Sequence, residues 1–318
     1  MPTRVSTVAP ISPLLTNVAV GYQNRAYVAP IVMPVVPVGS EKFTYYTFGK
    51  DHWKRYNTQR AVGAKAMRID YSLSTRTGTC KEYMIEHPID DRIRAEAQRP
   101  LDPDVQGTEL CTDALLLDWE KRVATKIMTS SNYASGMTST PSTKWDQAGA
   151  TIFDDITSAQ EAVRKKIGQY PNIILIPPEV AQVLAFSSEV TSYVKNVIGI
   201  SALREGAETG WMLPQQLFGM KVVVPAVIEV TSNLQQTETT ADVWADHVWL
   251  GYVNPRPAIM RPSFGYTFRR RNLRVRTYRD ETIKSDIIEV SFVQTEEVIA
   301  VDDDGKYIAG YLLTDVLT

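Results

Sequence analysis

The sequence predicts an α+β fold, and three patterns support this prediction. The apolar spacing of residues 102–128 is typical of one long amphipathic helix, and residues 41–85 contain the alternation of a long two-stranded hairpin. In residues 151–259, helical patterns alternate with short buried strands. A chain of 318 residues exceeds what one hydrophobic core usually serves, so we expect two packed domains with extended appendages.

The predicted long helix begins at a clear signal. Asp102 can cap the first turn, and Pro103 suits the first helical position because the N–H that proline lacks would have no partner there. The apolar stripe consists of Cys111, Leu115, Leu116, Trp119, Val123 and Ile127. The opposite side is expected to hold Glu109, Asp113, Glu120, Lys121 and Lys126. Such a helix is roughly 40 Å long, so a broad surface must lie against its stripe.

Residues 1–40 are predicted to form an extended arm, because prolines recur through them. These are Pro2, Pro10, Pro13, Pro30, Pro34 and Pro37. One short helix is expected around residues 16–26. The apolar run from Ile31 to Val38 needs a surface to lie along. The sequence leaves two interpretations open: a strap on the same subunit, or an arm that reaches another subunit.

The hairpin is predicted from two runs with a period of two. Phe43, Tyr45 and Thr47 mark the outgoing run, and residues 69–73 mark the returning one. Between them lie Trp53 and Tyr56 among the bases Lys50, Lys54, Arg55, Arg60, Lys65 and Arg68. A projecting hairpin of this kind has three interpretations: a solvated loop, a protein contact, or a single-stranded nucleic-acid site.

The rest of the chain reveals its elements through periodicity and turn residues. Pro88 is expected to open a short helix, and residues 129–149 to form a flexible surface loop and a domain boundary. Asp154 or Asp155 is expected to cap the next helix, which Gly168 ends. The sequence then predicts strands at residues 172–176, 221–224 and 244–253, and further strands over 264–277 and 283–313 with a turn at Asp304-Gly305.

Neither the composition nor the motifs of the chain indicate a catalytic site or a site for a cofactor or metal. The net charge of −2, from 34 basic and 36 acidic residues, provides no overall attraction to nucleic acid or membrane. The two cysteines fit neither a disulfide framework nor a zinc site, and no apolar run is long enough to span a bilayer. The three histidines lack neighbouring ligands or nucleophiles, and no phosphate-binding loop occurs. We therefore expect no catalytic residue, no cofactor and no metal, and a protein that is not an enzyme.

A dense run of arginines near the C-terminus has two interpretations. It starts with Arg269, Arg270 and Arg271 and continues with Arg274, Arg276 and Arg279. These side chains could contact phosphate or an acidic subunit surface. Alternatively, they could pair locally with the acids that follow, namely Asp280, Glu281 and Asp286.

Several stretches, taken in order, resemble a known family. They are residues 15–19 (LTNVA), 35–38 (VVPV), 99–104 (RPLDPD), 217–222 (LFGMKV), 255–257 (PRP) and 262–268 (PSFGYTF). Together with the order of elements, they are similar to the major capsid proteins of tailed double-stranded DNA bacteriophages, whose fold is named after phage HK-ninety-seven. The resemblance runs from the arm to the C-terminus.

The resemblance implies a division of the chain. Residues 1–40 would be the N-terminal arm and 41–85 an extended hairpin loop, the E-loop. Residues 86–150, with the spine helix 102–128, and residues 260–318 would form the peripheral domain. Residues 151–259 would form an α/β axial domain, with a loop at residues 196–211 near the symmetry axes.

The resemblance also implies a function. The chain would assemble through pentamers and hexamers into an icosahedral head shell around double-stranded DNA, which it would contact without sequence specificity. The expected partners are a separate scaffolding protein, a portal and a decoration protein. No contact with a membrane is expected. The protein would be located in the virion, after assembly in the host cytoplasm. Candidate interface residues are Trp53, Lys54, Arg55, Arg60, Arg269, Arg270 and Arg271. The alternatives are an encapsulin-type nanocompartment shell, and a soluble nucleic-acid-binding protein that uses residues 50–68 and 269–279.

Overall fold

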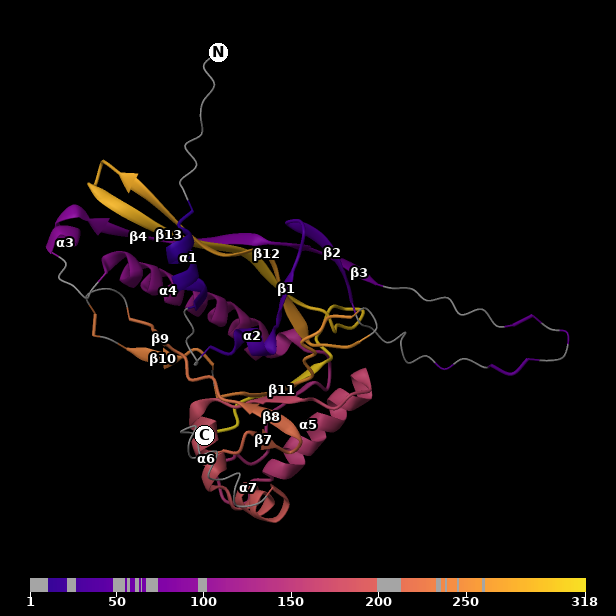
Figure 1. Cartoon of the computed structure of the whole chain (residues 1–318). Helices are drawn as coiled ribbons and strands as arrows, with labels where there is room; N and C mark the ends of the chain where they lie inside the picture. The colour runs from indigo at the N-terminus through magenta and orange to yellow at the C-terminus, as the bar shows by residue number, and fades with distance from the viewer. Residues whose placement is uncertain are drawn as a thin grey trace.

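Two β-sheets and a long helix organise the protein in a computed structural model (Figure 1). The structure describes residues 11–21, 27–47, 55, 58–60, 63, 65–66, 74–96, 102–198, 213–232, 236–237, 239–244, 246–258 and 261–318. The predicted returning strand at 69–73 and most of the loop at 196–211 lie outside these residues. None of the helices in the described part of the chain is both long enough and apolar enough to cross a membrane.

A four-stranded sheet has the order β1-β12-β13-β4. Its long central strands are β12, Gly265–Asp280, and β13, Ser285–Val298, which pair antiparallel as the C-terminal pattern predicted. The edge strand β4, Lys81–Asp90, pairs with β13 along its whole length. The helix expected at Pro88 begins only at α3, Asp91–Glu96, so this prediction was wrong. Pro88 is tolerated in β4 because an edge strand needs no N–H on its open side.

Helix α4, Pro103–Met128, lies along this sheet (Figure 1). The Asp102 carboxylate accepts a hydrogen bond from the Asp104 N–H at 3.0 Å, which confirms the predicted cap. The predicted stripe is buried except at Leu116, which is only half-buried.

One residue of this helix contradicts the predicted polar side. Glu120 is fully buried. It lies on the same face as the buried Thr108 and Thr112, which precede it by twelve and eight residues and bond their hydroxyls back to helix carbonyls. These two small polar residues give no apolar signal, so the pattern of apolar residues alone missed this face.

The described part of the arm is a strap on its own subunit. Helix α1, Pro13–Gly21, packs on β12 and α4, and the short helix α2, Ala29–Val32, packs on α4. Strand β1, Val35–Pro37, then pairs in parallel with Thr267, Phe268 and Arg269 of β12. The internal-strap interpretation therefore holds for residues 27–38.

A six-stranded sheet with the order β5-β14-β11-β6-β8-β7 forms the second layer. Its strands are β5 (Thr138–Ser139), β6 (Ile173–Leu175), β7 (Gln216–Leu217), β8 (Met220–Val223), β11 (Val248–Gly251) and β14 (Gly310–Leu313). The three predicted strands of the α/β region are β6, β8 and β11. Strand β14 joins this sheet, so the C-terminal stretch 260–318 divides between both sheets.

Helices cover this second sheet. They are α5 (Ile152–Ile167), α6 (Pro178–Phe186), α7 (Ser188–Tyr193) and a short π-helix (Val194–Ile198). Gly168 ends α5 at a φ of 69°, as predicted. The predicted aspartate cap was wrong, because α5 starts at Ile152 and the Asp155 carboxylate instead accepts a hydrogen bond from Trp145 Nε1 at 3.0 Å.

The stretch after α4 is not the flexible surface loop that its polar composition predicted. It contains a short 3-10 helix, Ser130–Asn132, and strand β5. Its widely spaced large residues Tyr133, Met137 and Trp145 are buried. The Tyr133 hydroxyl donates to the Ile127 carbonyl at 2.7 Å, so a few anchors hold a mostly polar segment.

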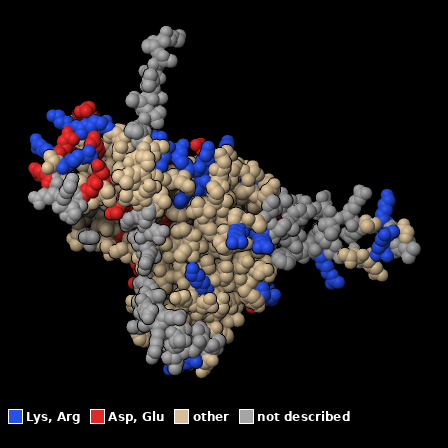
Figure 2. All heavy atoms as spheres, viewed as in Figure 1, with Lys and Arg blue, Asp and Glu red and all other residues tan. Residues whose placement is uncertain are grey.

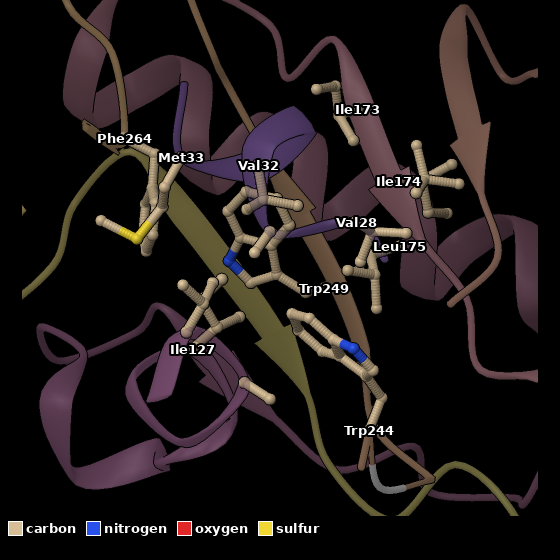
Figure 3. Close-up of a cluster of buried hydrophobic side chains, with 14 of the residues drawn as sticks. Val28, Val32, Met33, Ile127, Ile173, Ile174, Leu175, Trp244, Trp249 and Phe264 are labelled. Carbon is tan, nitrogen blue, oxygen red and sulfur yellow. The ribbon is translucent and has the colours of Figure 1, made fainter. Parts of the chain in front are cut away.

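The two layers meet in one core (Figure 3). Val32 and Met33 of the arm lie beside Trp249 and Phe264, with Ile127 of α4 next to them. A small ribbon of β9, Ile228–Val230, and β10, Thr240–Asp242, stands outside both sheets. At the C-terminal turn, Gly305 has a φ of +82° and its N–H donates to Asp302 O at 3.0 Å, which confirms the predicted turn.

Candidate assembly interface

The base of the predicted hairpin is anchored on the four-stranded sheet. Strands β2, Lys42–Tyr46, and β3, Thr75–Thr79, pair antiparallel. Their rings Phe43 and Tyr45 pack on Phe268 of β12, at centroid distances of 4.7 and 5.5 Å. Gly78 is required here, because a Cβ at that position would lie 2.5 Å from the Phe43 ring. Burial and the nearby Glu297 carboxylate raise the pKa of Tyr45, whose hydroxyl faces that carboxylate at 3.4 Å.

Beyond this base, basic side chains project away from the subunit. Arg55, Arg60 and Lys65 are exposed. Figure 2 shows Lys and Arg side chains at the outer end of the projection, well separated from the body. Trp53 and Lys54, the other two predicted interface residues of the hairpin, lie outside the described residues.

Two of the three consecutive arginines of β12 remain at the surface, and the third turns inward. Arg269 donates to Gln294 Oε1 through Nε at 2.9 Å and through a second nitrogen at 2.7 Å, and its guanidinium lies 5.0 Å from the Trp119 ring. Burial lowers the pKa of Arg269 to about 10, so it remains charged at neutral pH. Arg269 therefore stabilises its own subunit, while Arg270 and Arg271 are exposed beside a β-bulge.

The remaining arginines of this run mostly pair within the subunit. Arg271 reaches Glu82 at 3.2 Å and Arg276 approaches Glu289 at 3.9 Å. Arg279 pairs with Asp91 at 2.5 Å and also with Glu281 and Asp286, two of the three acids that the local-pairing interpretation named. The hydrogen bonds that the Arg279 guanidinium donates to Asp91 hold the pKa of Asp91 below its usual value.

A charged network that the sequence did not predict joins α4 to the four-stranded sheet. Glu296 is buried and accepts from Arg122 at 3.1 Å and from Gln294 Nε2 at 2.9 Å. The Arg122 guanidinium lies 3.7 Å from the centre of the Tyr83 ring, and Lys126 donates to the Glu296 carbonyl. The sequence signal was weak, because Arg122 and Lys126 resemble solvated residues of the polar face.

The far end of the sheet is rich in acidic residues. This end of the sheet holds α3, the start of α4 and the turn between β12 and β13. In Figure 1 it lies on the left, and the hairpin projects on the right. Among the described residues of this region, the acids outnumber the bases Arg92, Arg94, Arg279 and Lys284; the acids are Asp90, Asp91, Glu96, Asp102, Asp104, Glu109, Asp280, Glu281 and Asp286. Although Arg94 and Arg279 neutralise several of these acids, Glu96 and Glu109 are exposed. We name this region the acidic end.

One group of potential metal ligands occurs in the described part of the chain. Asp246, His247 and Asp315 place one ligand atom each within 4.8 Å of one another. However, His247 Nδ1 already accepts a hydrogen bond from the Asp315 N–H at 3.1 Å. This histidine is satisfied by the backbone, and we assign it no metal.

Phage capsid proteins are among the known proteins to which this chain is similar. No family model matches the chain. A curated protein named Major capsid protein, from Burkholderia phage BcepMu, is 27% identical over 325 residues, 98% of this chain and 99% of its own. A crystal structure of a phage-related protein from Bordetella bronchiseptica superposes with a TM-score of 0.69 over 97% of this chain and 98% of its own, at 24% identity. The mature capsid of bacteriophage PhiM1 gives a TM-score of 0.60 at 14% identity, over 93% of this chain and 90% of its own.

Proposed function

We propose that this chain builds the head shell of a phage, because it is similar over nearly its whole length to a major capsid protein and shares its fold with phage capsid structures. The full-length match to a major capsid protein carries this proposal. The chain is a structural protein of the virion and assembles with copies of itself. It is not an enzyme, and its capsid relatives favour the head shell over the nanocompartment and the nucleic-acid-binding alternatives.

The finer organisation of the shell is also part of the proposal. Pentamers and hexamers would close into an icosahedral head, built in the host cytoplasm around a separate scaffolding protein and a portal, with a decoration protein as an additional partner. Contact with packaged double-stranded DNA would be independent of sequence. A net charge of −2 agrees with such weak contact, because the subunit has no overall attraction to DNA.

The layers of the fold support a division into an arm, a hairpin and two domains. In this division, α4 and the four-stranded sheet form the peripheral domain, and the six-stranded sheet with α5, α6 and α7 forms the axial domain. Strands β5 and β14, from residues 86–150 and 260–318, are assigned to the axial layer because they pair there.

The hairpin is the proposed contact between neighbouring subunits. Its bases project from one end of the sheet, and the acidic end lies at the other (Figures 1 and 2). Complementary charges at opposite ends favour head-to-tail association, and head-to-tail contacts produce rings when the rotation closes. Each contact can be weak, because a closed shell repeats it many times.

Reversing the charge of the hairpin tests this proposal. The triple variant Lys54→Glu, Arg55→Glu and Arg60→Glu is expected to fold normally, as judged by circular dichroism, but to form no shells. Sedimentation and negative-stain electron microscopy measure the assembly. Normal shells from this variant would show that the hairpin charges do not hold subunits together.

A compensating variant tests the acidic end as the partner. Adding Glu96→Lys and Glu109→Lys to the triple variant restores opposite charges and is expected to restore part of the assembly. A control for the triple variant carries Lys165→Glu, Lys166→Glu and Lys221→Glu. It changes the net charge by the same amount as the triple variant, but on exposed residues elsewhere. If the compensating variant assembles no better than the triple variant, the hairpin docks on another surface.

A further inference from the structure

Glu120 stands out because its buried carboxylate is bonded to two distant parts of the chain. Glu120 lies in the C-terminal half of α4, and its exposed fraction is 0%. Oε1 accepts hydrogen bonds from the Val28 N–H at 3.0 Å and from Trp244 Nε1 at 2.9 Å. Oε2 accepts from the Ala29 N–H at 2.8 Å and from the Val28 N–H at 3.1 Å.

Two of these donors are N–H groups at the start of α2 that have no partner within the helix. Ala29 is the first residue of α2, and Val28 precedes it without offering a side-chain cap. The first N–H groups of any helix lack partners within the helix, and buried ones must find an acceptor elsewhere. Val28 and Ala29 are both buried, so the Glu120 carboxylate serves as the N-cap of a helix in the arm.

The third donor belongs to the other layer. Trp244 is buried in the segment that leads into β11 of the six-stranded sheet, and Figure 3 shows its indole below Trp249 in the core. Glu120 itself belongs to the helix that packs on the four-stranded sheet. One carboxylate therefore links the arm, the long helix and the axial layer.

Packing alone does not explain a glutamate at this position. Removing a carboxylate from water is costly unless hydrogen bonds compensate it, and an apolar side chain would fill the space at lower cost. Burial raises the pKa of Glu120, while the bonds from Ala29, Val28 and Trp244 act in the opposite direction. The bonds to the arm and to Trp244 are thus the reason for a carboxylate here.

We propose that Glu120 is the positioning residue that fixes the arm on the long helix and thereby sets the path of the chain into the hairpin. Only a few residues separate α2 from β1, and β1 from β2 at the hairpin base. The register of β1 on β12 and the start of β2 therefore follow from where α2 is held. This inference concerns the folded subunit and does not depend on shell assembly.

Hydrogen–deuterium exchange of the full-length unassembled chain tests the inference. In Glu120→Gln the amide nitrogen cannot accept a hydrogen bond, so exchange in peptides covering residues 27–33 is expected to rise roughly ten- to hundredfold. Peptides covering α5, in the other layer, should exchange as in the wild type. Glu179→Gln changes an exposed glutamate of α6 and should alter neither set of peptides.

Two milder variants keep the test decisive if Glu120→Gln does not fold. Glu120→Asp keeps the charge but withdraws it by one methylene, and should also raise exchange at residues 27–33. Trp244→Phe removes the indole donor and part of the buried ring but leaves the bonds from Glu120 to Val28 and Ala29, so the arm should remain protected and only the segment around residue 244 should exchange faster. Wild-type exchange at residues 27–33 in both Glu120 variants, or in Glu120→Asp alone if Glu120→Gln is unfolded, would overturn the inference.

Discussion

Trp249→Ala is expected to lower the free energy of unfolding by about 3–5 kcal/mol, because it removes one of the largest fully buried side chains from the core between the layers. The indole packs edge-on against Phe264 at 4.9 Å and lies over Gly251 and Gly310, which pair across β11 and β14. The cavity has a rigid lining of sheet backbone, so little relaxation can offset it.

The close packing of the Trp249 ring on Gly251 also predicts the effect of adding a side chain at Gly251. A Cβ at Gly251 would lie 2.1 Å from the Trp249 ring, so Gly251→Ala should also destabilise, by about 1–3 kcal/mol. Urea unfolding of the unassembled subunit, followed by circular dichroism, measures both changes. Gly39→Ala is the control, because a Cβ there meets nothing within 4 Å. A loss below about 1 kcal/mol for Trp249→Ala would contradict the described core.

Arg122→Met is expected to cost about 2–4 kcal/mol, because it leaves the buried Glu296 carboxylate without its cation. Arg122 keeps some exposure, with 20% of its side chain accessible, so the expected cost lies below that of a fully buried pair. The guanidinium also stacks on Tyr83, and this contact would be lost as well.

A double-mutant cycle separates the ion pair from the stacking. Adding Glu296→Gln to Arg122→Met removes the stranded charge and should recover a large part of the loss. Arg164→Met is a matched control, because its pair with Glu161 on α5 is exposed and should contribute little to stability. Additive effects of the two network substitutions would mean that Arg122 and Glu296 do not interact energetically.

Elements with their own local signals were predictable from the sequence. The stripe of α4, its Asp102 cap, Gly168 at the end of α5 and the buried strand β6 all follow from periodicity and turn chemistry. These signals suffice because each depends on neighbours within a few residues. Contacts with distant parts of the chain do not change the structure that these local signals predict.

Features that depend on distant partners were not predictable. Pro88 continues as strand because β4 has an open edge, which only the sheet order reveals. Residues 129–149 are ordered by three anchors whose partners lie elsewhere in the chain. Glu120 and Arg269 read as surface charges, yet their partners come from the arm and from β13. Among the candidate interface residues, Arg55, Arg60, Arg270 and Arg271 are exposed, whereas Arg269 turns inward, which the sequence did not indicate.

The particle size of the purified chain tests the shell function most directly. Sedimentation and negative-stain electron microscopy would be applied to the chain expressed alone and then together with a scaffolding protein. We expect closed shells, or ring-shaped pentamers and hexamers, under at least one of these conditions. A stable monomer or dimer under both conditions would contradict a shell-forming subunit and would turn attention to nucleic-acid binding by the basic stretches.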